Sequence, residues 1–228
     1  MNAKKNQANG FTLVELLIAI AISGILMTGV YAAFKSQQDS YLAQEQVAEM
    51  QQNIRAGLHF MAREIREAGY DPENTLGAGI VTATAGRLGF TRAELDADGK
   101  PTGASEEILY GFKNEDDSEP NGMADGGVAS LGRSVDDEGF EPVADNFQAI
   151  EFFYRLADGT QTTTPNNAQL AQIRTIRISM LARARHPDRN FRDSNVYQTA
   201  SGVEWGPFND NFRRRFQIMT VYMRNMGM

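Results

Sequence analysis

The stretch FTLVELLIAIAISGILMTGVYAAF, residues 11–34, decides the architecture of this chain, because it is a long apolar segment in an otherwise polar sequence. Its 24 residues carry a single charge, the carboxylate of Glu15. At about 1.5 Å of rise per residue, a helix of this length reaches roughly 36 Å, which is enough to cross the hydrocarbon core of a bilayer. We therefore predict a transmembrane helix over residues 11–34.

The ten residues before this helix predict how it is processed and oriented. A secretory signal has its cleavage site after the apolar run, whereas the candidate cleavage site here, after Gly10, precedes that run. The helix would then stay with the mature protein, and residues 1–10 would be a leader peptide. Lys4 and Lys5 precede the span, so the positive-inside rule keeps the leader in the cytoplasm. We expect residues 35–228 to lie across the membrane.

The overall composition indicates one globular domain attached to this anchor. Hydrophobic residues make up 42% of the chain and charged residues 22%, as in an ordinary soluble domain. The formal charge of −7 argues against broad affinity for nucleic acid or anionic lipid. The chain contains no cysteine, which excludes disulfide bonds, thiolate metal ligands and a cysteine nucleophile.

The helix is predicted to continue past the membrane as an amphipathic segment over residues 35–69. No proline occurs before Pro72, and residues 35–68 are rich in Gln, Glu, Ala and Arg, which favour helix. Apolar residues recur at steps of three or four: Val47, Met50, Ile54, Leu58, Met61 and Ile65. This spacing predicts one continuous helix over residues 11–68, stopped by Gly69 and Pro72, whose apolar stripe packs on a globular domain.

Residues 70–228 are predicted to form a globular β-rich domain. Three segments alternate with the period of a strand, namely residues 150–156, 176–182 and 216–223. Weaker strand candidates are residues 80–84, 87–92 and 106–113. Together they predict an antiparallel β-sheet lying on the amphipathic half of the long helix, which is an α+β fold.

Glu15 is anomalous, because an acid near the middle of a membrane helix costs about 2.5–3.5 kcal/mol, and less toward the interface. Two interpretations are open. In the first, Glu15 is close enough to the end of the span for its carboxylate to reach the headgroups. In the second, cleavage after Gly10 exposes a new α-amine at Phe11, and this ammonium neutralises the carboxylate of a neighbouring copy when helices bundle.

The segment GFTLVELLIAIAISGIL, residues 10–26, resembles the type III signal of type IV pilins and pseudopilins. It has glycine before the cut, phenylalanine after it and glutamate at the fifth mature position. The resemblance implies that a prepilin peptidase cleaves between Gly10 and Phe11 and methylates the Phe11 amine, and that Glu15 guides subunits into a filament. It also implies an inner-membrane precursor with a periplasmic domain, which later reaches the pilus on the cell surface.

Three further segments, residues 38–72, 139–159 and 206–225, resemble PilW-like minor pilins. We therefore expect a minor pilin that joins a type IV pilus or primes its assembly, with other pilin and minor pilin subunits as partners. A J-type minor pseudopilin of a type II secretion system shares this plan and is one alternative. A minor pilin for DNA uptake or adhesion is another. No nucleophile and base pair is visible in the sequence, so an enzyme is not expected.

The loop DSEPNGMADGG, residues 117–127, resembles part of a calcium-binding loop. It places Asp117, Glu119, Asn121 and Asp125 at positions one, three, five and nine, with a glycine at position six. Position twelve is Val128, where a bidentate acid is required. A solvated acidic loop is the favoured interpretation, weak calcium binding is a hypothesis, and no other cofactor is expected.

Basic residues gather near the C-terminus, in a run from Arg183 to Arg192 and in the triplet Arg213, Arg214 and Arg215. Such residues bind DNA phosphates or acidic partners in some proteins. Because the chain is acidic overall, a solvated face is the favoured interpretation, and nucleic acid is not expected as a partner. The two histidines, His59 and His186, belong to no triad or metal pattern.

Overall fold

The structure is a computed structural model that describes residues 10–226. The first nine residues, which include Lys4, Lys5 and most of the expected leader, lie outside the described residues. The chain divides into two compact units, Met1–Glu45 and Gln46–Met228. Each unit is described separately below.

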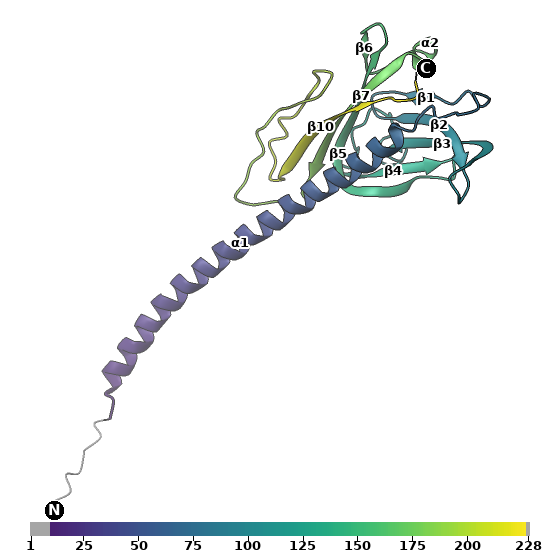
Figure 1. Ribbon diagram of the computed structural model, residues 1–228. Helices are drawn as coiled ribbons and strands as arrows, with labels where there is room; N and C mark the ends of the chain where they lie inside the picture. The colour runs from purple at the N-terminus through teal and green to yellow at the C-terminus, as the bar shows by residue number, and fades with distance from the viewer. Residues whose placement is uncertain (1–9, 227–228) are drawn as a thin grey trace, which may run out of the picture. The chain divides into compact units, whose positions relative to one another are not determined.

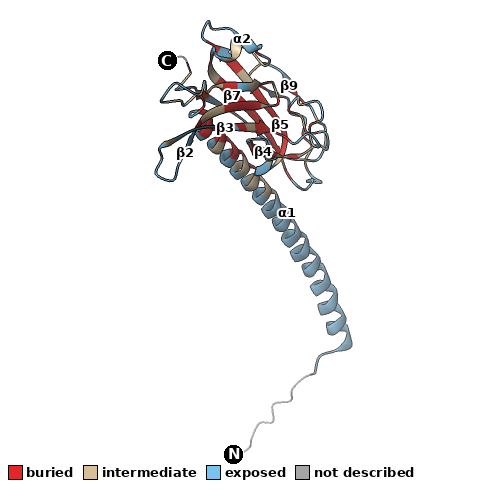
Figure 2. Cartoon of the chain, turned by 90° about the vertical axis from the view of Figure 1, so that its right-hand side faces the viewer, coloured by how far each residue is buried: buried red, intermediate tan, exposed pale blue. Residues whose placement is uncertain are grey.

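Helix α1 (Leu13–Ile65) contains 53 residues and begins in the first unit. Every residue from 10 to 42 is exposed, and Figure 2 draws this part of α1 in pale blue throughout. We expected a helix over residues 11–68, and the observed one is shorter at both ends. Hydrogen-bonded turns follow Ile65, and Gly69 then adopts a φ of 74°. Only glycine takes this left-handed conformation without strain, so Gly69 supports the predicted stop.

The second unit contains an eight-stranded antiparallel sheet in which strands follow the order β1-β2-β3-β4-β5-β7-β10, with β6 paired to β5 (Figure 1). The strands are β1 (Ile80–Ala83), β2 (Leu88–Leu95), β3 (Pro101–Gly111), β4 (Ala129–Val135), β5 (Glu141–Leu156), β6 (Gln161–Thr162), β7 (Ile173–Arg183) and β10 (Arg214–Tyr222). A short helix, α2 (Asn167–Leu170), precedes β7. Strands β8 (Tyr197–Gln198) and β9 (Glu204–Trp205) form a separate two-stranded sheet.

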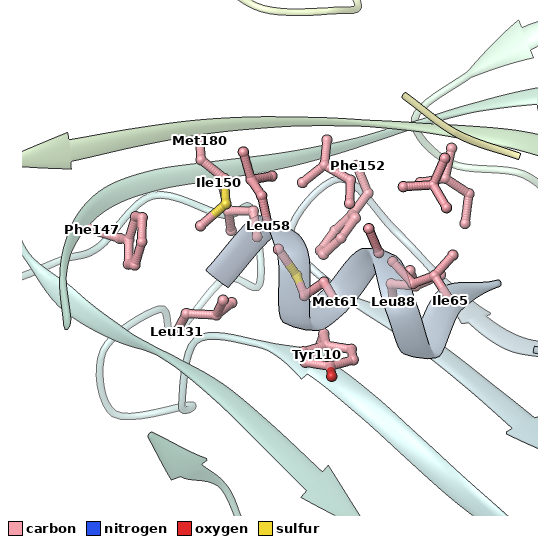
Figure 3. Close-up of a cluster of buried hydrophobic side chains, with 14 of the residues drawn as sticks. Leu58, Met61, Ile65, Leu88, Tyr110, Leu131, Phe147, Ile150, Phe152 and Met180 are labelled. Carbon is pink, nitrogen blue, oxygen red and sulfur yellow. The ribbon is translucent and has the colours of Figure 1, made fainter. Parts of the chain in front are cut away.

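The main core lies between the sheet and residues 46–65 of α1. Leu58, Met61 and Ile65 are fully buried, and in Figure 3 they point toward aromatic and aliphatic side chains of the sheet such as Phe152 and Tyr110. Figure 2 shows the same concentration of buried residues in the last turns of α1 and in the long strands. The predicted apolar stripe is therefore confirmed as the packing face, and the fold is the expected α+β arrangement of a long helix on an antiparallel sheet.

Close packing of α1 on the sheet depends on a glycine in the middle of the stripe. A Cβ atom added at Gly57 would lie 3.2 Å from Leu131 Cδ2 and 3.4 Å from Met180 Cε. Such distances are tight, so a larger residue there would push the helix away from β4 and β7. The absence of a side chain thus fixes how near the helix axis comes to the sheet.

The strand predictions succeeded where apolar and polar residues alternate. Ile150, Phe152 and Tyr154 of β5 share the core face, as do Ile176, Ile178 and Met180 of β7. Strand β4 was not predicted. Its sequence, ASLGRSV, contains serine, glycine and arginine at positions that pairing with β3 and β5 holds in the sheet.

A second apolar cluster covers the opposite face of the sheet. Ala149, Leu181 and Trp205 are its buried members, and Met123, Tyr197, Phe208 and Phe216 pack against them. The Trp205 and Phe216 rings meet edge to face with centroids 6.0 Å apart. The long connection between β7 and β10, which carries β8 and β9, is held on the sheet by this cluster.

Candidate functional site

The beginning of α1 is built by two residues of the sequence motif. The Thr12 hydroxyl accepts a 3.3 Å hydrogen bond from the Glu15 backbone N–H, and Glu15 Oε2 accepts a 2.9 Å bond from the Thr12 backbone N–H. The Thr12 hydroxyl also donates to Glu15 Oε2 at 2.9 Å. This reciprocal arrangement is a capping box, which satisfies backbone donors that the helix itself leaves without partners. Glu15 is therefore held one turn from the candidate cleavage site.

The residues on either side of the candidate cleavage site are open. Phe11 is 93% exposed, and no atom lies within 4 Å of the position that a Cβ would take at Gly10. The fold of the described chain therefore does not require glycine at position 10. A requirement for glycine would have to come from a partner that approaches the backbone closely.

The apolar part of α1 presents large side chains around its whole circumference. Exposed examples between residues 11 and 34 are Phe11, Leu13, Val14, Leu16, Leu17, Ile18, Ile20, Ile22, Ile25, Leu26, Met27, Val30, Tyr31 and Phe34. Soluble proteins rarely expose so large an apolar surface to water. Within residues 10–226, α1 is the one helix long and apolar enough to span a membrane. Lipid or neighbouring helices are the surroundings that suit this surface.

The far end of α1 is joined to the sheet by a buried carboxylate. Glu64 is 4% exposed and accepts two hydrogen bonds from the Arg133 guanidinium of β4, at 2.9 and 3.0 Å. The Tyr110 hydroxyl of β3 also donates to Glu64. Burial and this contact raise the pKa of Tyr110 well above its ordinary value. The two-pronged pairing fixes the rotation of the helix on the sheet as well as its position.

The acidic loop holds its carboxylates against its own backbone. Asp117 is fully buried and accepts hydrogen bonds from the N–H groups of Asn121 at 3.0 Å and Gly122 at 2.8 Å. Asp125 accepts from the backbone N–H and the hydroxyl of Ser118, and the backbone bond in particular lowers the pKa of Asp125. The alternating oxygen ligands that suggested calcium therefore close the loop in this structure.

The remaining residues of the calcium hypothesis do not complete a cation site here. Asn121 Oδ1 accepts from the Met123 N–H at 2.8 Å, and Glu119 is exposed. Among residues 10–226, no group of three or more His, Cys, Asp or Glu side chains is placed to hold a metal ion. Calcium binding stays a prediction from the sequence alone.

The basic triplet of residues 213–215 is not simply a solvated face, as we had favoured. The Arg214 side chain is fully buried and pairs with Asp193 at 2.9 Å and with Asp210 at 2.7 Å. The hydrogen bonds that Arg214 donates to Asp210 lower the pKa of Asp210. Burial, together with the hydrogen bond that the Tyr197 hydroxyl donates to Asp193, raises the pKa of Tyr197 to about 12. Arg213 pairs with Asp188 at 2.8 Å. These arginines hold the connection between β7 and β10 in place.

A different set of arginines lines the seam between α1 and the edge strand β10. We call Arg55, Arg63, Arg66, Arg215 and Arg224 the arginine seam; all five are exposed. They border two hollows, of about 250 Å³ beside Gln51 and Gln217, and of about 370 Å³ beside Tyr70 and Asn225. None forms an ion pair within residues 10–226, although Arg215 lies 2.7 Å from the Gln51 side-chain amide.

The sequence analysis did not identify the arginine seam. The spacing of Arg55, Arg63 and Arg66 puts them on one helix face, a signal that was available. The spacing of residues could not show that β10, about 150 residues further along the chain, lies beside this face. Strand β10 adds Arg215, and the residues after it add Arg224. The seam depends on the tertiary fold.

Comparison with known proteins identifies the family to which the chain belongs. Residues 5–31 match the family model of the prokaryotic N-terminal methylation motif, and residues 107–225 match that of Type IV Pilus-assembly protein W. The Type IV major fimbrial protein FimA of Dichelobacter nodosus is 31% identical over 119 residues, which cover 47% of this chain and 69% of FimA. A type IV-like pilin from Thermus thermophilus has a TM-score of 0.51 at 15% identity, and the match covers 78% of this chain and 96% of that one, a likeness of fold.

A capped apolar helix that carries a methylation motif and continues onto an antiparallel sheet defines a type IV pilin. More narrowly, the chain belongs to the Type IV Pilus-assembly protein W family, since that family's model covers residues 107–225, more than half of its length. Pilins are structural proteins, so the chain is not an enzyme. The resemblance seen in the sequence is confirmed at the level of the family.

Proposed function

We propose that this chain is a minor pilin, made as a single-pass inner-membrane precursor with its C-terminal domain in the periplasm, and incorporated into a type IV pilus or priming its assembly. Prepilin peptidase would cleave between Gly10 and Phe11 and methylate the Phe11 amine. The observation that carries the proposal is the combination of Gly10, Phe11 and Glu15 at the start of an uninterrupted apolar helix.

The geometry of this motif supports two separate requirements. The open surroundings of Gly10 are consistent with glycine serving a peptidase that must reach the backbone. The hydrogen bonds to Thr12 hold the Glu15 carboxylate at the beginning of α1, one turn from the amine that cleavage would release. An ammonium on a neighbouring subunit would then meet a carboxylate already in position.

A pilus is favoured over the secretion pseudopilus by the match of residues 107–225 to the pilus-assembly family. The first 34 residues do not separate the two alternatives, because both classes of protein share the leader and the apolar helix. Roles in DNA uptake or adhesion would be further properties of the same filament subunit.

Replacement of Glu15 tests the proposal. Glu15→Leu removes the charge but keeps the helix apolar, so the variant should insert and be cleaved yet be absent from sheared filaments. Mass analysis of the N-terminus would report cleavage and methylation, and immunoblotting of sheared filaments would report incorporation. Leu16→Ile, an apolar exchange next to it, is the matched control and should assemble normally. Normal incorporation of Glu15→Leu would contradict the proposed function.

A further inference from the structure

The charges of the second unit are divided between two parts of the sheet. Residues 70–169, with strands β1 to β6, contain 19 acidic and six basic residues, a formal charge of −13. Residues 170–228, with β7 to β10, contain ten basic and four acidic residues, a formal charge of +6. Because β7 and β10 are neighbours at one side of the sheet, the domain has an acidic side and a basic side.

The arginine seam joins Arg215 and Arg224 of the basic side to three arginines at the end of the long helix, and none of the five forms an ion pair within residues 10–226. The five guanidinium groups are exposed, and their only described polar contact with a side chain is that of Arg215 with the Gln51 amide. From Arg55 to Arg66 the helix rises by about 16 Å, so the seam is an extended surface. Unpaired arginines arranged in this way suit an acidic surface of similar length.

The complementary surface is present on the same chain, along the hairpin of β2 and β3 and at the turn between β4 and β5. We call its exposed carboxylates the acidic edge: Glu94, Asp96, Asp98, Glu107, Asp136, Asp137, Glu138 and Glu141. The β4–β5 turn lies beside β3, because the Glu107 N–H of β3 donates to Asp136 Oδ1 at 2.8 Å and the Asp136 N–H donates to the Glu107 carbonyl at 2.9 Å. Within residues 10–226, none of these carboxylates forms an ion pair.

We infer that the arginine seam of one copy binds the acidic edge of a second copy, in a head-to-tail contact between neighbouring subunits. The inference rests on the proposed function, because it names one of the contacts that a filament subunit would make. The two surfaces lie on different elements, so the contact is heterologous. Heterologous contacts that do not close into a ring repeat along a helical assembly, as a filament requires.

The size and charge of the seam favour this occupant over two others. A phosphate or a single carboxylate would engage one or two guanidinium groups and leave the rest of the roughly 16 Å surface without a partner. A DNA duplex would bring its phosphates toward a domain whose larger part carries a charge of −13, and the repulsion would oppose binding. An acidic edge on a protein partner offers several carboxylates to the guanidinium groups at once without presenting a continuous polyanion.

Cysteine cross-linking between two full-length chains tests this contact directly, since the sequence contains no cysteine of its own. One chain carries Gln217→Cys beside the seam, and the other, with a different tag, carries Ser105→Cys next to the acidic edge. Both positions are exposed. With both chains in one membrane, mild oxidation should give a disulfide-linked heterodimer. The yield should fall when the ionic strength rises to about 0.5 M.

Charge reversal makes the test specific. Arg63→Glu with Arg66→Glu in the Gln217→Cys chain should lower the heterodimer yield about tenfold, because like charges then face each other. Glu107→Lys with Glu138→Lys in the Ser105→Cys chain should restore it, which also shows that both variants are folded. The matched control is Arg189→Glu with Arg192→Glu, two exposed arginines outside the seam, which should leave the yield unchanged.

The outcomes separate this inference from the proposed function. Chains found in sheared filaments without the heterodimer would overturn the inference and leave the pilin role intact. The heterodimer in membranes of chains that never enter filaments would support the contact and contradict the pilin role. Binding of a DNA duplex that Arg63→Glu with Arg66→Glu abolishes, in the absence of any heterodimer, would assign the seam to nucleic acid and overturn the inference.

Discussion

Under the proposed function, the Glu15 carboxylate would serve both the single chain and an assembly. In the single chain it accepts hydrogen bonds from Thr12 and closes the first turn of α1. Those bonds leave its other oxygen available, so a neighbouring ammonium can approach without breaking the cap. The interpretation in which the side chain merely reaches the headgroups stays open, because both interpretations place the carboxylate at the same end of the helix.

Asp117 offers a residue-scale prediction that also addresses the calcium hypothesis. Replacing it with alanine removes the acceptor for two loop N–H groups, so Asp117→Ala should lower the free energy of unfolding by about 1–3 kcal/mol. Thermal denaturation should show the same loss in millimolar calcium and in chelator. Glu119→Ala, at an exposed position of the same loop, should have little effect. A calcium-dependent stabilisation of the parent chain that Asp117→Ala removes would instead establish a cation site.

Asp210 provides a prediction for acid stability. The hydrogen bonds from Arg214 lower the pKa of Asp210 in the folded chain below its value in the unfolded chain. The folded state therefore binds fewer protons, and the stabilisation is present above about pH 4 and is lost as the pH falls through the lowered pKa. The difference in unfolding free energy between the parent and Asp210→Asn should be largest near neutral pH and should shrink toward about pH 2.

The control for this pH effect is a change that cannot titrate. Thr220→Ala on β10 is exposed, so its effect on the unfolding free energy should be the same at every pH. Chemical denaturation at a series of pH values would measure both variants. A constant difference between the parent and Asp210→Asn would mean that the Arg214 pairing does not shift this carboxylate.

At the scale of elements, the packing of α1 on the sheet is governed by its apolar stripe. Leu58 is fully buried in the main core, so Leu58→Ala should cost about 2–5 kcal/mol of unfolding free energy. Gln52→Ala, on the exposed face of the same helix, should stay within about 0.5 kcal/mol of the parent. Denaturant unfolding would measure both variants. Equal losses of unfolding free energy would contradict the assignment of Leu58 to the packed face of α1 and Gln52 to its exposed face.

Elements were predictable from the sequence where their own residues carry the pattern. The stripe from Met50 to Ile65 and the alternation in β5 repeat over several turns or pairs, so the spacing of apolar residues alone located them. Strand β4 has no such repeat; its neighbours β3 and β5 hold Gly132 and Ser134 in the sheet. Burial of Arg214 was equally hidden, because its partners Asp193 and Asp210 lie in a loop whose path the sequence does not show.

At the scale of the whole molecule, the proposed contact sites also differ in whether the sequence alone could locate them. The N-terminal motif lies within a few adjacent residues, so the sequence was enough to find it. The arginine seam joins α1 to β10, and the acidic edge joins the hairpin of β2 and β3 to the turn between β4 and β5. Charge counted over the chain gave −7 and suggested only an acidic protein. The separation of charge into an acidic side and a basic side of the sheet became visible only when the strand order was known.

The division of the chain into two units gives the final prediction. The buried core residues lie at or beyond Met50, Val47 packs against them, and residues 10–42 are exposed, so removing residues 1–34 takes nothing from the core. The truncated chain should fold, stay in the soluble fraction at high salt, and unfold within about 2 °C of the full-length protein in detergent. Removal of residues 1–57 deletes Met50 and Ile54 as well, and that chain should not fold. If the shorter deletion also gave an unfolded chain by circular dichroism, the membrane segment would have to contribute to folding of the domain.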